Sequence, residues 1–321
     1  MYARVQLIPC LMRSFCTYSS WVSCRNSQKR IDFAVLVSHV SSTWRNLAFS
    51  CSSLWADITI TADNMHKVDG ELAIVNASLL RAKEFASRSR VFSLFVRLKL
   101  FTTPNLDFEY FRLGTIMTMN WLRLVLPRVK YLSIHCDTLQ VAWLVTKCLH
   151  TAPMETLETC KMKYGTTILS FCHSIIPPPV RFLFLAGQNE EQAADNFFPK
   201  LTRVKASGFP VSWSQWSLTR LTSLSINFMT LHDRPLMDVL KYILTINRET
   251  LEKFEIQGAI RQFGTLLRNA NELPTNLPRL ADLTLGYLSQ WEAIIFFLHF
   301  ETPALKHLKL CDISRSILAQ H

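Results

Sequence analysis

Glycine is scarce in this sequence, with only 8 residues among 321. Enzymes that bind nucleotides need glycine where the backbone approaches a phosphate closely, so this count disfavours that class. The sequences G-x-S-x-G, H-E-x-x-H, G-x-G-x-x-G and the P-loop are also absent, as is any run of 18 apolar residues. We therefore expect a chain that is not an enzyme, holds no cofactor and has no membrane-spanning helix.

Acidic residues are also few, since 24 Asp and Glu stand against 35 Lys and Arg and give a net charge of +11. The basic residues are spread along the chain, and Lys29-Arg30 is the densest pair. This scatter favours solvated charges over a dedicated polyanion groove. We therefore do not expect nucleic acid as the partner, but nucleic-acid binding remains an alternative.

Cysteines number nine, an odd count, and the sequence has no convincing secretory signal. We therefore expect reduced thiols in a cytoplasmic or nuclear protein. Residues 1–31 contain basic but no acidic residues, which is also the composition of a mitochondrial transit peptide. Mitochondrial import is thus the second option for the location.

An internal repeat runs through the second half of the chain. The pattern apolar-x-x-apolar-x-apolar recurs eight times with first positions 20 to 30 residues apart, at or close to the period of leucine-rich repeats. The last two apolar positions alternate with an exposed one, as in a short strand with one buried face. The triplets are Val129-Leu132-Ile134, Leu157-Cys160-Met162, Val180-Leu183-Leu185, Leu201-Val204-Ala206, Leu221-Leu224-Ile226, Leu251-Phe254-Ile256, Leu280-Leu283-Leu285 and Leu305-Leu308-Leu310.

Proline and helical patterns separate these triplets. Proline precedes most of them closely, which suits a turn into a strand because proline lacks an N–H donor. Residues 137–150, 234–245, 259–271 and 287–300 have the apolar spacing of an amphipathic helix. Repeats of this kind bury their apolar faces only against their neighbours. We therefore predict an α/β fold: an irregular leucine-rich-repeat solenoid with a curved parallel sheet and helices on its outer side. A generic α/β fold is the alternative.

Residues 31–60 have a different pattern, which predicts a helical hairpin. Phe33, Leu36 and Val40 share one helical face, and Trp44 and Leu47 continue an apolar stripe. Such a hairpin would cap the first repeat, whose core the solvent would otherwise reach.

The same region resembles the second half of the F-box found in fungal, basidiomycete-type proteins with C-terminal leucine-rich repeats. Ser41 and Ser42 stand where that family has a cysteine and an arginine, and the acidic residue expected after Ile8-Pro9 is absent. The segments that match the family pattern are Trp44-Arg45, Leu47-Ala48 and Ser53-Leu54-Trp55.

The resemblance implies a substrate-recognition adaptor of an SCF-type, cullin-RING ubiquitin ligase. The F-box would bind a Skp-type adaptor, and the repeats would hold a target protein, which raises its effective concentration without chemistry in this chain. A leucine-rich-repeat scaffold without ligase function and a basic-face polyanion binder are the alternatives. The residues that would contact the adaptor are Leu36, Val40, Trp44, Leu47, Leu54 and Trp55.

We accordingly expect three parts in the chain. Residues 1–62 would form a degenerate F-box-like helical module, and residues 63–125 would hold a connecting helix and the first repeat strand or strands. Residues 126–321 would form the leucine-rich-repeat solenoid.

The strand period also predicts a recognition surface on the inner face of the sheet, from positions exposed within or just after each strand. Four lysines there would attract an acidic or phosphorylated segment of a target. The positions chosen are His135, Lys161, Lys163, Phe184, Lys205, Asn227, Gln257 and Lys309.

Four cysteines recur at a spacing of 12 residues: Cys136, Cys148, Cys160 and Cys172. Zinc sites usually gather their ligands as two close pairs, and no C-x-x-C sequence is present. We therefore expect small core residues here and no metal.

Overall fold

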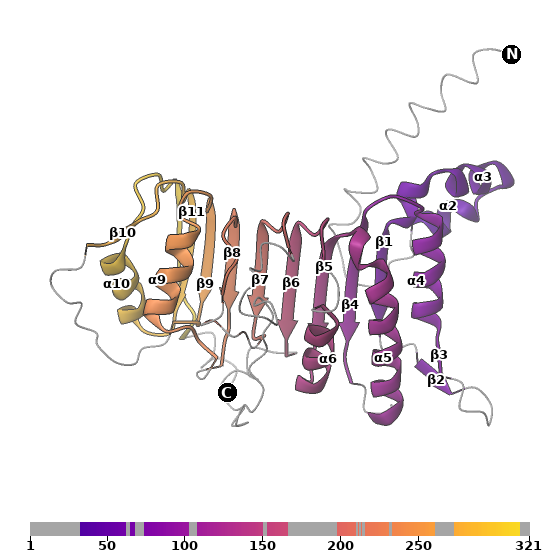
Figure 1. The fold of residues 1–321 in the computed structure, drawn as a ribbon, viewed down its shortest axis with the longest axis horizontal. Coiled ribbons are helices and arrows are strands. Elements are labelled where there is room, and N and C mark those ends of the chain that lie inside the picture. The colour runs from indigo at the N-terminus through magenta and orange to yellow at the C-terminus, as the bar shows by residue number, and fades with distance from the viewer. Residues whose placement is uncertain are drawn as a thin grey trace, which may run out of the picture.

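The order of the strands along the chain sets the architecture. The computed structural model describes residues 33–61, 65–67, 74–102, 108–149, 153–165, 198–209, 211, 213, 216–230, 233–260 and 273–314. Within them, nine parallel strands form one sheet in which each strand pairs with the next one along the chain (Figure 1). In sheet order they are β1 (Asp57–Thr61), β4 (Leu94–Leu100), β5 (Val129–Cys136), β6 (Thr159–Tyr164), β7 (Arg203–Ser207), β8 (Ser223–Asn227), β9 (Lys253–Gln257), β11 (Asp282–Tyr287) and β13 (His307–Asp312).

Two small sheets stand beside the large one. Strand β2 (Met65–Lys67) pairs antiparallel with β3 (Ile74–Asn76), and β10 (Thr275–Asn276) pairs parallel with β12 (Phe300–Glu301). Neither of them is part of the nine-stranded sheet.

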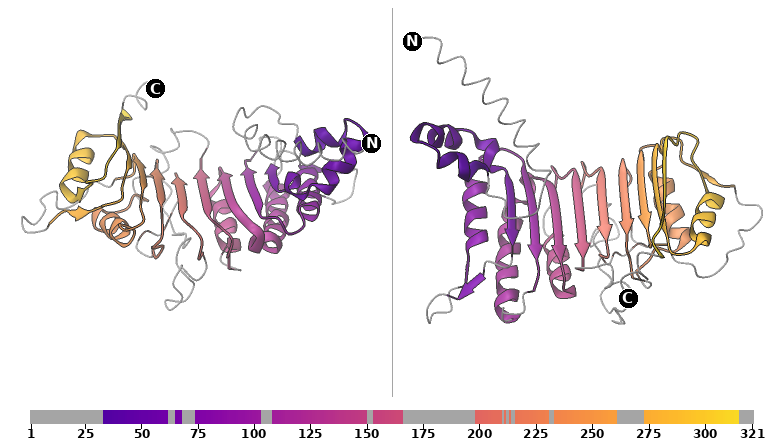
Figure 2. Two further views of the ribbon diagram at one scale, coloured as in Figure 1. Left: turned by 90° about the horizontal axis from the view of Figure 1, so that it is seen from above. Right: turned by 180° about the vertical axis from the view of Figure 1, so that it is seen from behind.

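Helices cover one face of the large sheet. The sheet is curved when seen from above, and α4, α5, α6 and α9 lie along its outer side (Figure 2). The described helices are α2 (Phe33–Ser38), α3 (Ser42–Ser50), η1 (Ser52–Trp55), α4 (Ala77–Arg88), α5 (Phe108–Val125), η3 (Leu126–Arg128), α6 (Leu139–Leu149), α9 (Met237–Ile246) and α10 (Gln290–His299). Helices α6, α9 and α10 fall within three of the four helices predicted from the apolar spacing, to within a residue; of the fourth, residues 261–271 lie outside the described residues.

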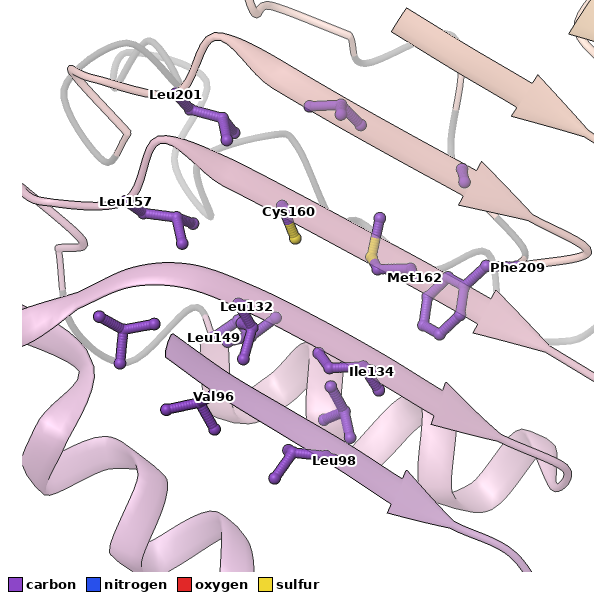
Figure 3. Packing of buried hydrophobic residues seen from close by; sticks show 14 of the residues in the cluster. Val96, Leu98, Leu132, Ile134, Leu149, Leu157, Cys160, Met162, Leu201 and Phe209 are labelled. Atoms are coloured by element: carbon purple, nitrogen blue, oxygen red, sulfur yellow. The ribbon is translucent and has the colours of Figure 1, made fainter. Parts of the chain in front are cut away.

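The apolar triplets lie on consecutive strands and in register. Leu132 on β5 aligns with Cys160 on β6, which aligns in turn with Val204 on β7. The side chains of Leu132 and Cys160 point to one side of the sheet, where Leu149 of α6 also lies (Figure 3). From β5 to β11 the second and third position of every described triplet is no more than 2% exposed. The prediction of an α/β protein with a large parallel sheet is therefore confirmed.

The sheet extends further toward the N-terminus than the triplets indicate. It begins with β1, inside the range expected to be purely helical, and β4 buries Leu94, Val96, Leu98 and Leu100. Strand β4 lies within residues 63–125, where the first repeat strand or strands were expected, whereas β1 lies inside the range expected to hold the helical module. The Val180-Leu183-Leu185 triplet lies outside the described residues, and β6 and β7 are hydrogen-bonded directly to each other.

A left-handed residue ends four successive strands. Gly165, Gly208, Phe228 and Gly258 follow β6, β7, β8 and β9 with φ values of 87°, 63°, 54° and 53°. Each donates its N–H to a carbonyl oxygen at the end of a neighbouring strand, as Gly208 does to Asn227 at 2.8 Å. Glycine adopts this conformation without steric cost, so three of the four positions use it. Four successive strands of the main sheet thus end in a common turn.

The last strand leaves apolar positions uncovered. Leu308 on β13 is 48% exposed, whereas Leu283, its register partner on β11, is 1% exposed. No described strand pairs with the far edge of β13. The triplet leucine of β13, at the edge of the sheet, is thus far less buried than its register partner on β11, which lies between two strands.

Candidate binding surfaces

The outward side chains of the nine strands form an ordered polar surface, which we call the open face. Because the strands are in register, residues from separate repeats stand side by side in rows across the sheet. The middle row contains Thr59, Arg97, Ser133, Lys161, Lys205, Ser225, Glu255, Thr284 and Lys309. The next row contains Thr61, Lys99, His135, Lys163, Ser207, Asn227, Gln257, Gly286 and Cys311.

Basic residues gather on the part of the open face formed by β4 to β7, which we call the basic half. No outward position of these four strands is acidic. Among the described residues, Lys99, Lys161 and Lys163 have no carboxylate within ion-pair distance. The six cations of the basic half are Arg97, Lys99, Lys161, Lys163, Arg203 and Lys205.

Acidic residues mark both sides of the basic half. Asp57 on β1 forms an ion pair with Arg97, and Glu255 on β9 forms one with Lys205 at 3.3 Å between Oε2 and Nζ. The positive surface is therefore four strands wide and closed by negative charge on either side.

An aromatic side chain connects the cations at the centre. The Arg97 guanidinium lies 5.4 Å and the Lys161 ammonium 5.3 Å from the centre of the Tyr131 ring. Phe95 stacks on Tyr131 with 6.3 Å between ring centres. Cation–π contacts of this kind stabilise an exposed cation by about 0.5–1 kcal/mol, so Tyr131 restrains two positive charges on the strands beside it.

Glu255 organises the adjoining part of the open face. Its carboxylate accepts hydrogen bonds from Ser225 Oγ at 2.9 Å, Asn227 Nδ2 at 2.9 Å, Gln257 Nε2 at 2.7 Å and Lys205 Nζ at 3.3 Å. Burial alone would raise the pKa of Glu255, but these hydrogen bonds and the Lys205 charge outweigh it and lower the pKa. The carboxylate is ionised at neutral pH, and its acceptor sites are used within the protein.

This network changes the roles of two residues predicted to contact a target. Asn227 is 2% exposed and donates to Ser225 and Glu255, so its assignment to the recognition surface was wrong. Gln257 is half-buried and turned toward Glu255. Both residues hold the network together from within the sheet.

His135 lies in the basic half but is tethered. Its Nε2 lies 3.0 Å from the carbonyl oxygen of Gly165, and its ring meets Phe101 edge-on at 4.4 Å between centres. Burial lowers the pKa of His135, and the charges of Lys163 and Lys99 lower it further, although the Gly165 hydrogen bond opposes this. We therefore treat His135 as a neutral spacer between two lysines.

The remaining predicted target-contacting residues have mixed outcomes. Lys161, Lys163 and Lys309 are exposed on the open face, and Lys205 is half-buried beside Glu255. Phe184 lies outside the described residues. Lys309 stands on β13, away from the basic half.

Four residues of the basic half were missed by the sequence analysis: Arg97, Lys99, Tyr131 and Arg203. The alternation of Leu94, Val96, Leu98 and Leu100 would have identified Arg97 and Lys99 as outward positions. The first repeat strand or strands were expected within residues 63–125, but no contact residue was chosen there.

The helical module before β1 presents apolar side chains to solvent. Leu36 on α2 is 49% exposed and Val40, just after it, is 65% exposed. Trp44, Leu47 and Leu54 are half-buried, and both Trp44 and Leu54 pack against the core. Of the residues predicted to contact an adaptor, Leu36 and Val40 have the most accessible surface.

Trp55 belongs to the core, so its assignment as a contact residue was wrong. Its side chain is 0% exposed, and its Nε1 donates to the Ala48 carbonyl oxygen at 2.8 Å. Phe85 of α4 meets its ring edge-on at 5.1 Å between centres, and Arg88 lies 4.5 Å over the ring. Trp55 therefore fastens α3 to α4.

Three buried cysteines of the described residues, Cys136, Cys148 and Cys160, hold their thiols in the protonated form. Burial raises the pKa of both Cys136 and Cys160 to about 12 and that of Cys148 to about 11. The described residues contain no cluster of His, Cys, Asp and Glu able to hold a metal ion, and Cys172 lies outside them. None of the described helices is long and apolar enough to cross a membrane.

Comparison with protein-family models, with curated proteins and with solved structures finds no match for this chain. The fold itself defines an α/β protein with one large parallel sheet, helices on its outer side and an open polar face. Any argument about function therefore starts from the two surfaces described above.

Proposed function

We propose that this chain is the substrate receptor of an SCF-type, cullin-RING ubiquitin ligase, with an F-box-like module followed by an irregular leucine-rich-repeat solenoid. One observation carries the proposal. A sheet built strand by strand in chain order, with one face open, directly follows a helical hairpin that exposes Leu36 and Val40.

The hairpin supplies the surface that would bind the Skp-type adaptor. Ser41 caps α3 by accepting a hydrogen bond from the Trp44 N–H at 3.3 Å, and Arg45 Nε donates to the Ser38 carbonyl oxygen at 2.9 Å. These bonds fix the turn between α2 and α3, which holds Val40. Full burial of a valine or leucine side chain stabilises a complex by about 1.5–3 kcal/mol, so two such residues are enough for a specific contact.

The repeats supply the surface that would hold the target. Each unit of strand, turn and return segment buries its apolar face against its neighbours, and its outward side chains line the open face. The open face is wide because nine strands contribute to it. A target bound there would be held near the ubiquitin-loaded enzyme, and the receptor would contribute position without chemistry.

Adaptor capture tests the proposal. Val40→Asp and Leu36→Asp place a charge on the hairpin, whereas Leu124→Asp makes the same change on α5, where Leu124 is 81% exposed. We expect immobilised Skp-type adaptor to retain the wild-type chain and Leu124→Asp equally, and to bind the double variant on the order of a hundred-fold more weakly.

Circular dichroism and urea denaturation would establish that all three chains are folded. Wild-type chain that passes unretained, or a double variant that is retained like the wild type, would contradict the adaptor role. The first of these results would favour a leucine-rich-repeat scaffold without ligase function.

A further inference from the structure

We propose that the basic half of the open face binds an extended acidic segment of a target protein, which crosses β4 to β7 with acidic side chains at alternate positions. The inference deepens the proposed function, because it concerns the face that would hold the target. It specifies the kind of segment, its direction across the sheet and the residues that contact it.

The unpaired lysines of the basic half favour an acidic ligand. Lys99, Lys161 and Lys163 are exposed and have no ion-pair partner among the described residues, so a ligand carboxylate or phosphate would displace only water. Lys205, by contrast, is already paired with Glu255. An acidic segment would therefore be held mainly by these three lysines, and its ends would share Arg97 and Lys205 with Asp57 and Glu255.

The distances between the cations of one row favour an extended segment. Neighbouring strands lie about 4.8 Å apart, so Arg97 and Lys161, two strands apart in one row, are separated by roughly 10 Å, and Arg97 and Lys205 by roughly 14 Å. An extended peptide advances about 3.3 Å per residue, and residues i, i+2 and i+4 on one face span roughly 13 Å. Three acidic side chains at alternate positions thus match the width of the basic half.

The second row of cations favours an extended ligand over a helical one. Lys99 and Lys163 stand two residues further along the same strands as Arg97 and Lys161, or roughly 7 Å away. The two rows together form a band of positive charge, and the bound segment would run between them. A helix, which is about 10 Å wide with its side chains, would bring few acidic groups to both rows at once.

The boundaries of the band favour a peptide over a nucleic acid. Asp57 and Glu255 lie on either side of the four strands and would repel a long phosphodiester chain that continued past them. The Tyr131 ring already contacts Phe95 and two cations, which leaves little of its face for a stacked base. A short segment carrying three or so charges meets neither obstacle.

Peptide binding to the full chain tests the inference. The probe is a fluorescent peptide of alternating glutamate and serine, compared by anisotropy with a peptide of the same composition whose glutamates are contiguous. We expect the alternating peptide to bind about ten-fold more tightly, and Lys161→Glu to weaken its binding by about ten-fold or more. Lys309→Glu, the same charge change in the same row on β13, should leave binding within about two-fold of the wild type.

Four results would overturn the inference: equal binding of the two peptides, equal losses in Lys161→Glu and Lys309→Glu, tighter binding of single-stranded RNA of similar charge, or no peptide binding at low salt. Urea denaturation shows whether each variant is folded, and Lys161→Gln, which removes the charge without reversing it, should give a smaller loss in the same direction. The peptide assay needs no adaptor, and Val40→Asp should bind the peptide normally. Failure of the acidic-segment model is thus distinguishable from failure of the adaptor role.

Discussion

Burial at the triplet positions predicts a large difference between two leucines that differ only in their place in the sheet. Leu283 and Leu308 occupy the same triplet position on β11 and β13 and are register partners. One is 1% and the other 48% exposed. Truncation of each to alanine removes the same atoms, so the difference in stability measures what a following strand adds.

The expected magnitudes follow from that burial. Leu→Ala at a fully buried site costs about 2–5 kcal/mol, because transfer free energy is lost and a cavity remains. We expect about 3 kcal/mol for Leu283→Ala. At Leu308 about half of the surface is already in water and the surroundings are free to relax, so Leu308→Ala should cost about 1 kcal/mol or less.

Urea denaturation followed by circular dichroism would measure both values from the shift in midpoint at a common slope. Leu308→Ala should unfold close to the wild type, and Leu283→Ala at clearly lower urea. Equal and large losses in the two variants would refute the reasoning, since they would mean that β13 is covered in solution as fully as β11.

Two further predictions concern the turns and the thiols. Gly208→Ala should destabilise the chain by about 2 kcal/mol, because φ is 63° and the added Cβ would lie 2.7 Å from the Tyr164 carbonyl oxygen, whereas Ser207→Ala should change the urea midpoint little. Cys136 and Cys160 should resist Ellman's reagent at pH 8 until urea unfolds the chain, since a pKa of about 12 leaves a thiolate fraction on the order of 10⁻⁴. Rapid modification of either thiol in the folded chain would contradict that burial.

The strands from β5 onward could be predicted because alternation of apolar and polar residues reports burial directly. Leu224-Ile226 and Phe254-Ile256 have that alternation, and the structure buries them in register. The parallel pairing also followed, because helical segments separate the strands and a parallel neighbour needs a crossover. These are local signals, and they were sufficient for the main sheet.

Strand β1 could not be predicted with the same rule. The Ile58-Ile60 pair of β1 is too short to distinguish a strand from the end of a helical module, and it becomes a strand by pairing with Val96-Leu98 of β4. That pairing joins segments separated by α4, so no local pattern announces it.

Side-chain networks were the least predictable part of the candidate surfaces. A tryptophan in an amphipathic segment suits a core and an interface equally, and contacts with Phe85 and Arg88 of α4 help to bury Trp55. Asn227 occupies an outward position, but Glu255 on the next strand draws it into the sheet. The burial of both residues depends on a partner about 30 positions along the chain.

The strand order described above has a consequence for synthesis on the ribosome. Every strand of the main sheet after β1 pairs with the preceding strand of that sheet, so its template is already synthesised when it emerges. Domains commonly fold during translation from the N-terminal side, and here each loop closed is short. The nascent chain can therefore assemble one rung at a time, and no strand has to wait for a distant part of the sequence before it finds its place.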